Sequence, residues 1–234
     1  MTIKPHFIWI MLAGAMIPTA LAQPEAAAKV RIRAVLHDPM KPFAEMYVQG
    51  ATGTVMRLNL AMEGLTVPQV VTLTNGVLQL YSSATIDAAK PLANLLASVS
   101  VPSTVKQAII FILPVGEKDR QSYKLMVLND AFDVFPKGES RIINMTRLPL
   151  AVKAGENSRQ ITPASIVAVP QVTKVNDLNQ AQTVFYHFVD KQPVVLSERP
   201  MQYSNKLRNI FLIYQMPNVD EPQIRTLIDT SNPQ

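Results

Sequence analysis

The stretch from Val70 to Tyr81, VVTLTNGVLQLY, decides the fold class of this 234-residue chain. Apolar and polar residues alternate on both sides of Asn75-Gly76, and alternation with a period of two is typical of a half-buried β-strand. Asn-Gly is the dipeptide preferred by a two-residue type I′ turn, because both central residues of that turn have φ > 0. We therefore predict two antiparallel strands joined by a structural turn at Asn75 and Gly76.

This turn also predicts which side chains share a face. A two-residue loop places Leu73 opposite Leu78 and Val71 opposite Leu80 on one face of the pair. The threonines and Gln79 fall on the other face. One apolar and one mostly polar face are what a half-buried antiparallel pair needs.

Short apolar segments of the same kind recur along the chain. Each has four to eight residues rich in Val, Ile, Leu or aromatics and is bounded by Pro, Gly, Asn or Asp, which is the signature of strands. The 18 prolines punctuate the chain at intervals that argue against long helices. A turn at 154–158 predicts a further hairpin. The expected strands outside the opening stretch are 30–36, 45–48, 55–61, 108–113, 123–128, 140–145, 150–153, 159–162, 166–169, 184–189 and 207–214.

One segment, 87–98, allows two interpretations. Its leucine spacing favours a short helix with Pro91 in the first turn. The alternative is a loop that leads into a strand at 97–101.

The number and spacing of these strands predict an all-β protein with an antiparallel β-sandwich architecture. We expect two packed immunoglobulin-like units, 29–130 and 131–228, followed by a tail at 229–234. The boundary would lie near 129–133, and one larger sandwich is the alternative.

The N-terminus has the pattern of a secretory signal at 1–22. A lysine near the start is followed by an apolar run at 7–17, which is too short to span a bilayer. An Ala-Leu-Ala triplet then predicts cleavage between Ala22 and Gln23, with 23–28 as a short tether. A membrane anchor that stays attached is the alternative. Cleavage would place the protein in the periplasm or outside the cell.

Composition excludes several classes of site and partner. The chain has no cysteine, so disulfides and cysteine-ligated metals are excluded. The formal net charge of +5 is spread along the chain without a block of Lys or Arg, so we expect no nucleic-acid partner. No segment after the signal reaches the length of a membrane helix, so we expect no membrane span after cleavage.

The sequence contains no recognised catalytic or metal-binding motif, so we predict no catalytic, cofactor-binding or metal-binding residue. Two histidines follow the signal, His37 and His187, and their spacing is not that of metal ligands. The α/β-hydrolase nucleophile motif and glycine-rich phosphate loops are absent. The oxygen-rich segment 129–133 does not match a calcium loop, and Asn144 begins a glycosylation sequon. The sequence leaves open a catalytic pair of carboxylates, because any two strands could bring two such side chains together.

Two fragments resemble periplasmic pilus chaperones. The run at 113–122, LPVGEKDRQS, is similar to the L-P-x-D-R-E-S run of that family, with an insertion and a Gln for Glu. The run at 212–217, LIYQMP, is similar to its K-L-F-Y-R-P strand, with Gln for Arg. The resemblance implies strand lending to an incomplete subunit, with an exposed edge strand and cleft cations. Arg31 or Arg33 and Lys206 are the candidates for those cations.

A broader resemblance is to uncharacterised exported bacterial β-sandwich proteins. It rests on the turn and strand at 135–145, FPKGESRIINM, and on the segment 150–155. This resemblance implies export and β structure.

These observations predict an exported non-enzymatic β-sandwich protein that binds or scaffolds another macromolecule, a protein or polymer of the cell envelope. A chaperone-like assembly factor acting by strand pairing is one alternative. A hydrolase of envelope polymers with unrecognised carboxylates is the other. A long uncovered strand edge beside clustered Arg or Lys would favour the first alternative. A cleft holding two carboxylates about 5–10 Å apart would favour the second. The sequence does not specify the oligomeric state.

Overall fold

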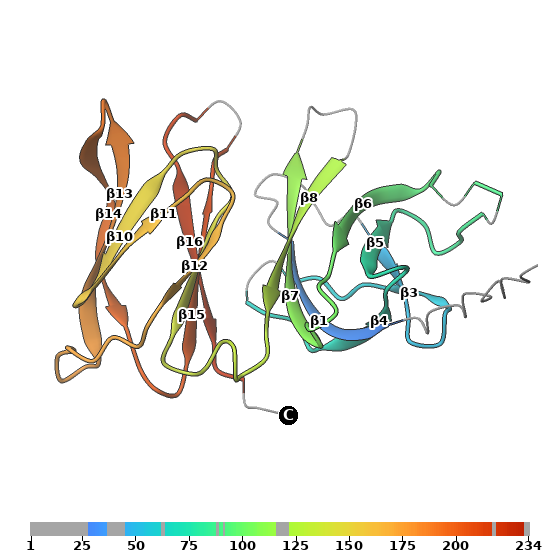
Figure 1. Cartoon of the computed structure of the whole chain (residues 1–234), viewed down its shortest axis with the longest axis horizontal. Coiled ribbons are helices and arrows are strands. Elements are labelled where there is room, and N and C mark those ends of the chain that lie inside the picture. Colours follow the sequence, from blue (N-terminus) through green and yellow to red (C-terminus); the bar gives the residue numbers. More distant parts are fainter. Residues whose placement is uncertain are drawn as a thin grey trace, which may run out of the picture.

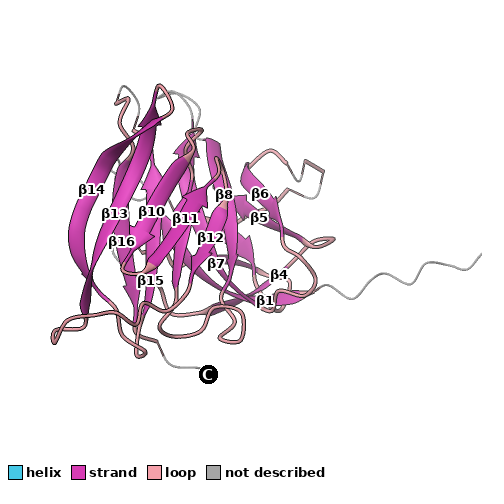
Figure 2. Cartoon of the chain, turned by 60° about the vertical axis from the view of Figure 1, so that its left-hand side comes forward, coloured by secondary structure: helices cyan, strands magenta, loops and turns pink. Residues whose placement is uncertain are grey.

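The protein is described from a computed structural model, which places residues 28–36, 45–61, 64–87, 89–90, 92–115, 122–216 and 219–231. These described residues form sixteen strands and no helix (Figure 2). The prediction of an all-β, antiparallel-rich sandwich architecture is therefore confirmed. The predicted signal, with Ala22 and Gln23, and His37 lie outside the described residues.

Eight strands come from the first half of the chain and form two four-stranded sheets, in the orders β4-β1-β7-β8 and β3-β2-β5-β6. The eight strands are β1 (Lys29–Leu36), β2 (Tyr47–Gln49), β3 (Val55–Arg57), β4 (Gln69–Thr72), β5 (Val77–Tyr81), β6 (Leu95–Ser100), β7 (Gln107–Val115) and β8 (Ser122–Asn129).

Eight strands from the second half form two more sheets, in the orders β12-β9-β15-β16 and β11-β10-β13-β14. These strands are β9 (Ser140–Asn144), β10 (Leu150–Ala154), β11 (Asn157–Ile161), β12 (Ile166–Val169), β13 (Gln180–Val189), β14 (Gln192–Gln202), β15 (Arg208–Tyr214) and β16 (Gln223–Asp229).

The two halves repeat one topology, because adding eight to each strand number converts the first pair of sheets into the second. Both halves include one parallel pair, β1 with β7 and β9 with β15, among otherwise antiparallel neighbours. We call the halves the first and second sandwich. The immunoglobulin-like identity of each stays a prediction.

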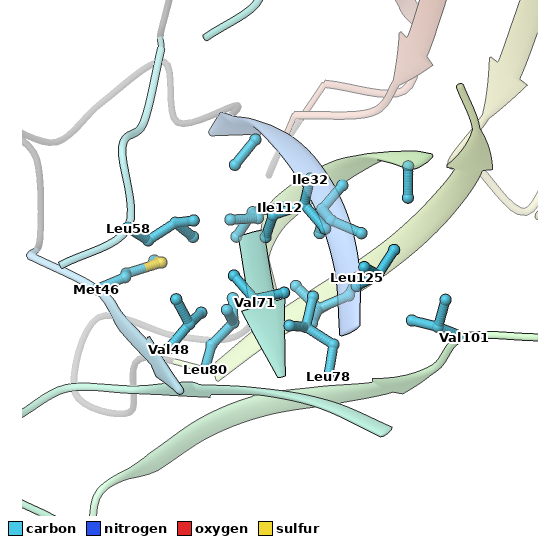
Figure 3. Close-up of a cluster of buried hydrophobic side chains, with 14 of the residues drawn as sticks. Ile32, Met46, Val48, Leu58, Val71, Leu78, Leu80, Val101, Ile112 and Leu125 are labelled. Atoms are coloured by element: carbon cyan, nitrogen blue, oxygen red, sulfur yellow. The ribbon is translucent and has the colours of Figure 1, made fainter. Parts of the chain in front are cut away.

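The four sheets stack as successive layers (Figure 1). The two sheets that face each other at the centre, β4-β1-β7-β8 and β12-β9-β15-β16, are the inner sheets, and the other two are the outer sheets. Each sandwich has its own apolar core between its inner and outer sheet. In the first sandwich, Ile32 and Val71 from the inner sheet point toward Leu78 and Leu80 from the outer sheet (Figure 3).

A third apolar core lies between the inner sheets and joins the sandwiches. Its first-sandwich members include Val35, Ile109, Phe111 and Leu128, and its second-sandwich members include Ile143, Ile210, Leu212 and Leu227. These residues form equivalent pairs in strand register. For example, Val35 pairs with Phe111 and Ile143 pairs with Leu212. The interface therefore has the self-complementary character of an isologous dimer contact, built within one chain.

The predicted pairing across Asn75-Gly76 is wrong, although the turn itself forms. Asn75 and Gly76 have φ of 53° and 73°. Only Thr74 pairs with Val77, after which β4 joins β1 in the inner sheet and β5 joins β6 in the outer sheet. The local pattern matched a hairpin, but the strands diverge to opposite sides of the same core.

The segment 87–98 and the hairpin at 150–162 test two further predictions. The segment 87–98 ends in strand β6, preceded by a turn at 92–94, so the preference for a helix is wrong. The leucine spacing there serves a strand, in which Leu96 packs against the first core. The predicted hairpin at 150–162 is confirmed as β10 and β11, which pair from Leu150–Ile161 to Ala154–Asn157.

Candidate functional site

The candidate site is a group of four buried charged side chains where the inner sheets meet. Arg33 lies within β1, and Asp130 directly follows β8. Arg208 is the first residue of β15, and Asp229 is the last residue of β16. All four side chains are less than a tenth exposed. We call them the four-charge cluster.

Arg33 joins the two carboxylates through a forked set of hydrogen bonds. Its Nε and Nη2 donate to the two oxygens of Asp130 at 2.8 and 2.6 Å. Its Nη1 and Nη2 donate to the two oxygens of Asp229 at 3.1 and 2.8 Å. Bidentate guanidinium–carboxylate pairs of this kind are strong and fix geometry.

Arg208 completes the cluster from the second sandwich. Its Nη2 donates to Asp130 Oδ1 at 2.8 Å and also to Asp229 Oδ2, and its Nε donates to Asp229 Oδ2 at 3.0 Å. Its Nη1 donates to the backbone oxygen of Phe135 at 2.9 Å. The guanidinium carbon lies 4.4 Å from the ring centroid of Phe132 and 4.5 Å from that of Phe135, which adds cation–π attraction.

Arg33 and Asp229 stabilise each other's charged forms. Burial acts to raise the pKa of Asp229, but hydrogen bonds from Arg33 and Ser231 outweigh it and lower this pKa well below its usual range. Burial acts to lower the pKa of Arg33, but hydrogen bonds to Asp229 and Asp130 raise it overall. The cluster thus joins two arginines and two aspartates in one set of buried ion pairs.

Strand register explains how the cluster spans the sandwiches. Asp229 pairs with Arg208 across β15 and β16, and Asp130 occupies the corresponding place opposite Gln107. The parallel pairs β1–β7 and β9–β15 place Arg33 and Arg141 at equivalent positions of the two sandwiches. Arg141 is not part of the cluster, because it bonds Glu139 and stacks on Phe135. Each arginine of the cluster therefore contacts one aspartate of its own sandwich and the equivalent aspartate of the other.

A cleft of about 350 Å³ opens beside the cluster, and we call it the inter-sandwich cleft. The first sandwich contributes Arg31, Arg33 and Gln107, together with the segment 65–68. The second contributes the segment 228–231. Asp130 lines the cleft from the end of the first sandwich, and Phe132 lines it from the connection between the sandwiches.

The structure separates the three predicted cleft cations. Arg33 is buried in the cluster, Arg31 lines the inter-sandwich cleft, and Lys206 lies exposed in the turn before β15. His187 is half-buried in β13, opposite Leu150 and Val194.

Asn144 has a structural role. Its side chain is fully buried, its Nδ2 donates to the backbone oxygens of Leu148 and Thr162, and its Oδ1 accepts from Thr146. The folded chain therefore does not present this sequon to a glycosylating enzyme.

Sequence reasoning missed the four-charge cluster as a unit. A signal was present, because Arg33 stands in the apolar strand VRIRAVL and Arg208 begins another. A charge inside an apolar strand needs a buried partner. The partners, Asp130 and Asp229, are 97 and 196 positions away from Arg33, so only the tertiary fold identifies them.

Among the residues that the structure describes, no three His, Asp or Glu side chains gather as metal ligands. In the same part of the chain, no helix is long and apolar enough to cross a bilayer. A scan against protein-family models finds no match for this sequence, and a search of curated proteins finds none either.

Proposed function

We propose that this chain is an exported, non-enzymatic β-sandwich protein that binds or scaffolds another macromolecule of the cell envelope. One observation carries the proposal. Four large apolar side chains are exposed together at the free end of the β13–β14 hairpin, namely Phe188, Val189, Val194 and Val195, with exposed fractions from 36% to 51%. Clustered exposed apolar side chains mark interaction sites in soluble proteins. We call these four residues the hairpin end.

The hairpin end extends past its neighbouring strand. β10 pairs with β13 only between Thr183 and His187, so residues beyond His187 have β14 as their single strand partner among the described residues. Asp190 and Lys191 close the hairpin with φ of 49° and 65°, the type I′ signature. Alternating residues of a strand point to opposite faces, so the hairpin end offers apolar groups on both faces.

Strand pairing is less well supported, because the longest free edge is a poor template. β14 has eleven residues and lies at the edge of its sheet. It contains Pro193 and Pro200, which have no N–H to donate. Prolines on an edge strand commonly block edge-to-edge association.

Polymer hydrolysis is also less well supported. The inter-sandwich cleft does hold two carboxylates, Asp130 and Asp229. However, Arg33 and Arg208 bond both of them, and the pKa of Asp229 is lowered. A general acid at this position would need a raised pKa.

Site-specific photocrosslinking tests the proposal. We would place p-benzoylphenylalanine at Val194 and, as the matched control, at Val70 on edge strand β4. Their exposed fractions are 41% and 42%. In cells, Val194 should yield a discrete crosslinked species in the envelope fraction, and Val70 should not.

A second measurement links the crosslink to binding. The variant Val194→Ser/Val195→Ser should lose association with the envelope fraction while its circular dichroism stays unchanged. Equal crosslinking at the two positions, or unchanged association of the serine variant, would overturn the assignment of the hairpin end.

A further inference from the structure

The inter-sandwich cleft contains a guanidinium that the four-charge cluster does not use. Arg33 and Arg208 are neutralised by Asp130 and Asp229, whereas no carboxylate among the described residues pairs with Arg31. Arg31 is half-buried on β1, two residues before Arg33. The described lining holds two arginines and two aspartates, and Arg208, which bonds both aspartates without lining the cleft, brings the local balance to one excess positive charge.

Neutral polar groups surround that charge. Thr66, Gln107, Thr230 and Ser231 line the cleft with hydroxyl and amide groups. Thr66 Oγ1 accepts from the backbone N–H of Ala34 at 3.0 Å, and Ser231 Oγ accepts from Arg33 Nη1 at 3.3 Å. Each hydroxyl keeps its own O–H for another acceptor. Among the described residues, none engages the side-chain amide of Gln107 in a hydrogen bond.

The geometry points to a binding site for a small hydroxylated monocarboxylate, the chemical class that includes uronic acids. The fork of Arg31 matches a carboxylate, and one excess charge matches a monoanion better than a phosphate monoester with nearly two charges. The amide and hydroxyl groups suit ligand hydroxyls. Exposed Val67 and Ile228 provide contacts for the apolar face of a sugar ring. A volume of about 350 Å³ suits one small molecule.

Nuclear magnetic resonance titration of the full ¹⁵N-labelled chain tests this site. The ligands are glucuronate, glucose, acetate and inorganic phosphate, which separate the contributions of charge and hydroxyls. Glucuronate should bind saturably, shift the side-chain amide of Gln107, and bind at least about tenfold more tightly than glucose or acetate. A loss of this size is expected when a charged or hydroxyl hydrogen bond is missing.

Variants of Arg31 test whether its guanidinium binds the carboxylate of the ligand. Arg31→Gln should weaken glucuronate binding about tenfold or more, and Arg31→Lys should weaken it less, because a point charge remains. The matched control is Arg159→Gln, which removes an exposed arginine on strand β11 and should leave affinity unchanged. Circular dichroism of each variant checks the fold.

Three results would overturn the inference. They are equal affinity for glucuronate and acetate, tighter binding of phosphate than of glucuronate, and equal effects of Arg31→Gln and Arg159→Gln. A parallel titration with an oligogalacturonate distinguishes a site for an acidic polysaccharide from a site for a free sugar acid. Tighter binding than the monosaccharide supports the site as one for an acidic polymer, and equal binding supports it as one for a free sugar acid.

Discussion

Asp130 and Asp229 occupy equivalent positions in the two sandwiches and accept hydrogen bonds from the same two arginines. One aspartate follows β8 and the other ends β16, so the shared arginines connect elements from both halves of the chain. Beside them, the apolar core between the inner sheets is also assembled from equivalent residues. Polar and apolar contacts thus act together to hold the sandwiches in one arrangement.

Replacing Asp229 by asparagine should destabilise the whole protein. Arg33 and Arg208 would stay buried with one carboxylate between them, and breaking a buried ion pair costs about 3–5 kcal/mol. Urea unfolding measures this loss. The control is Glu45→Gln, which removes an exposed ion pair with Arg57 and should cost less than about 1 kcal/mol. Equal losses for the two variants would contradict a stabilising role of the cluster.

The same carboxylate makes stability depend on acidic pH. The pKa of Asp229 is lower in the folded chain than the value of about 3.9 expected when unfolded. Its stabilising contribution is therefore complete above about pH 4 and is lost as the pH falls toward the folded pKa. Urea melts from pH 6 to pH 2 should show a steep loss below about pH 4. Asp229→Asn should flatten that profile, and an unchanged profile would refute the assignment.

Glu156 is expected to titrate abnormally for a different reason. It lies in the turn between β10 and β11, where the backbone N–H of Thr173 and the hydroxyl of Thr173 donate to its carboxylate at 2.7 and 2.8 Å. The N–H of Lys174 donates at 3.3 Å, and together these bonds lower the pKa of Glu156 to about 2. Carbon-detected NMR titration should find that value. Titration near the usual value of about 4.3 would mean that this loop contact is absent in solution.

The turn at Asn75-Gly76 shows what the sequence could and could not predict. A type I′ turn depends on two residues that accept positive φ, which is a local property. Strand partners depend on contacts across the chain, and here Leu73 donates its N–H to Ala28 rather than pairing with Leu78. Both leucines still reach the same core, so alternation predicted their burial but not their sheets.

The candidate site was harder to predict than the fold for a related reason. Strand character recurs in short windows of sequence, so the all-β architecture was accessible. Arg33 could be recognised as unusual from its apolar neighbours, but Asp130 sits in an Asn- and Asp-rich turn of ordinary appearance. The repeated topology was hidden as well, because the halves share strand order and core positions without a fixed sequence period.

The core between the inner sheets predicts that both sandwiches unfold together. Phe111 is fully buried in that core, and Phe→Ala substitutions at such positions cost about 3–5 kcal/mol. Calorimetry should show one transition for the native chain and one at lower temperature for Phe111→Ala. The control is Leu92→Ala, which changes an exposed side chain and should scarcely change the transition temperature of the native chain. Two well-separated transitions in the native chain would contradict the coupling.

Thr72 distinguishes the observed strand arrangement from a simple hairpin. In a hairpin closed by Asn75-Gly76, Thr72 would face solvent, and its replacement would cost less than about 1 kcal/mol. In the structure, Thr72 is 8% exposed and its hydroxyl donates to the backbone oxygen of Gly50 at 2.7 Å.

Thr72→Val keeps the shape of the side chain but leaves the Gly50 oxygen with one donor, the backbone N–H of Gly53 at 2.9 Å. Losing the buried hydrogen bond from the hydroxyl should cost about 0.5–1.5 kcal/mol. The control is Thr74→Val, because Thr74 is exposed and its hydroxyl bonds only Gln49 at 3.2 Å among the described residues. Urea melts should rank Thr72→Val well below Thr74→Val in stability. If the two variants are equally stable, β4 does not pack against the Gly50 turn, and the split of the two strands between the inner and outer sheets is incorrect.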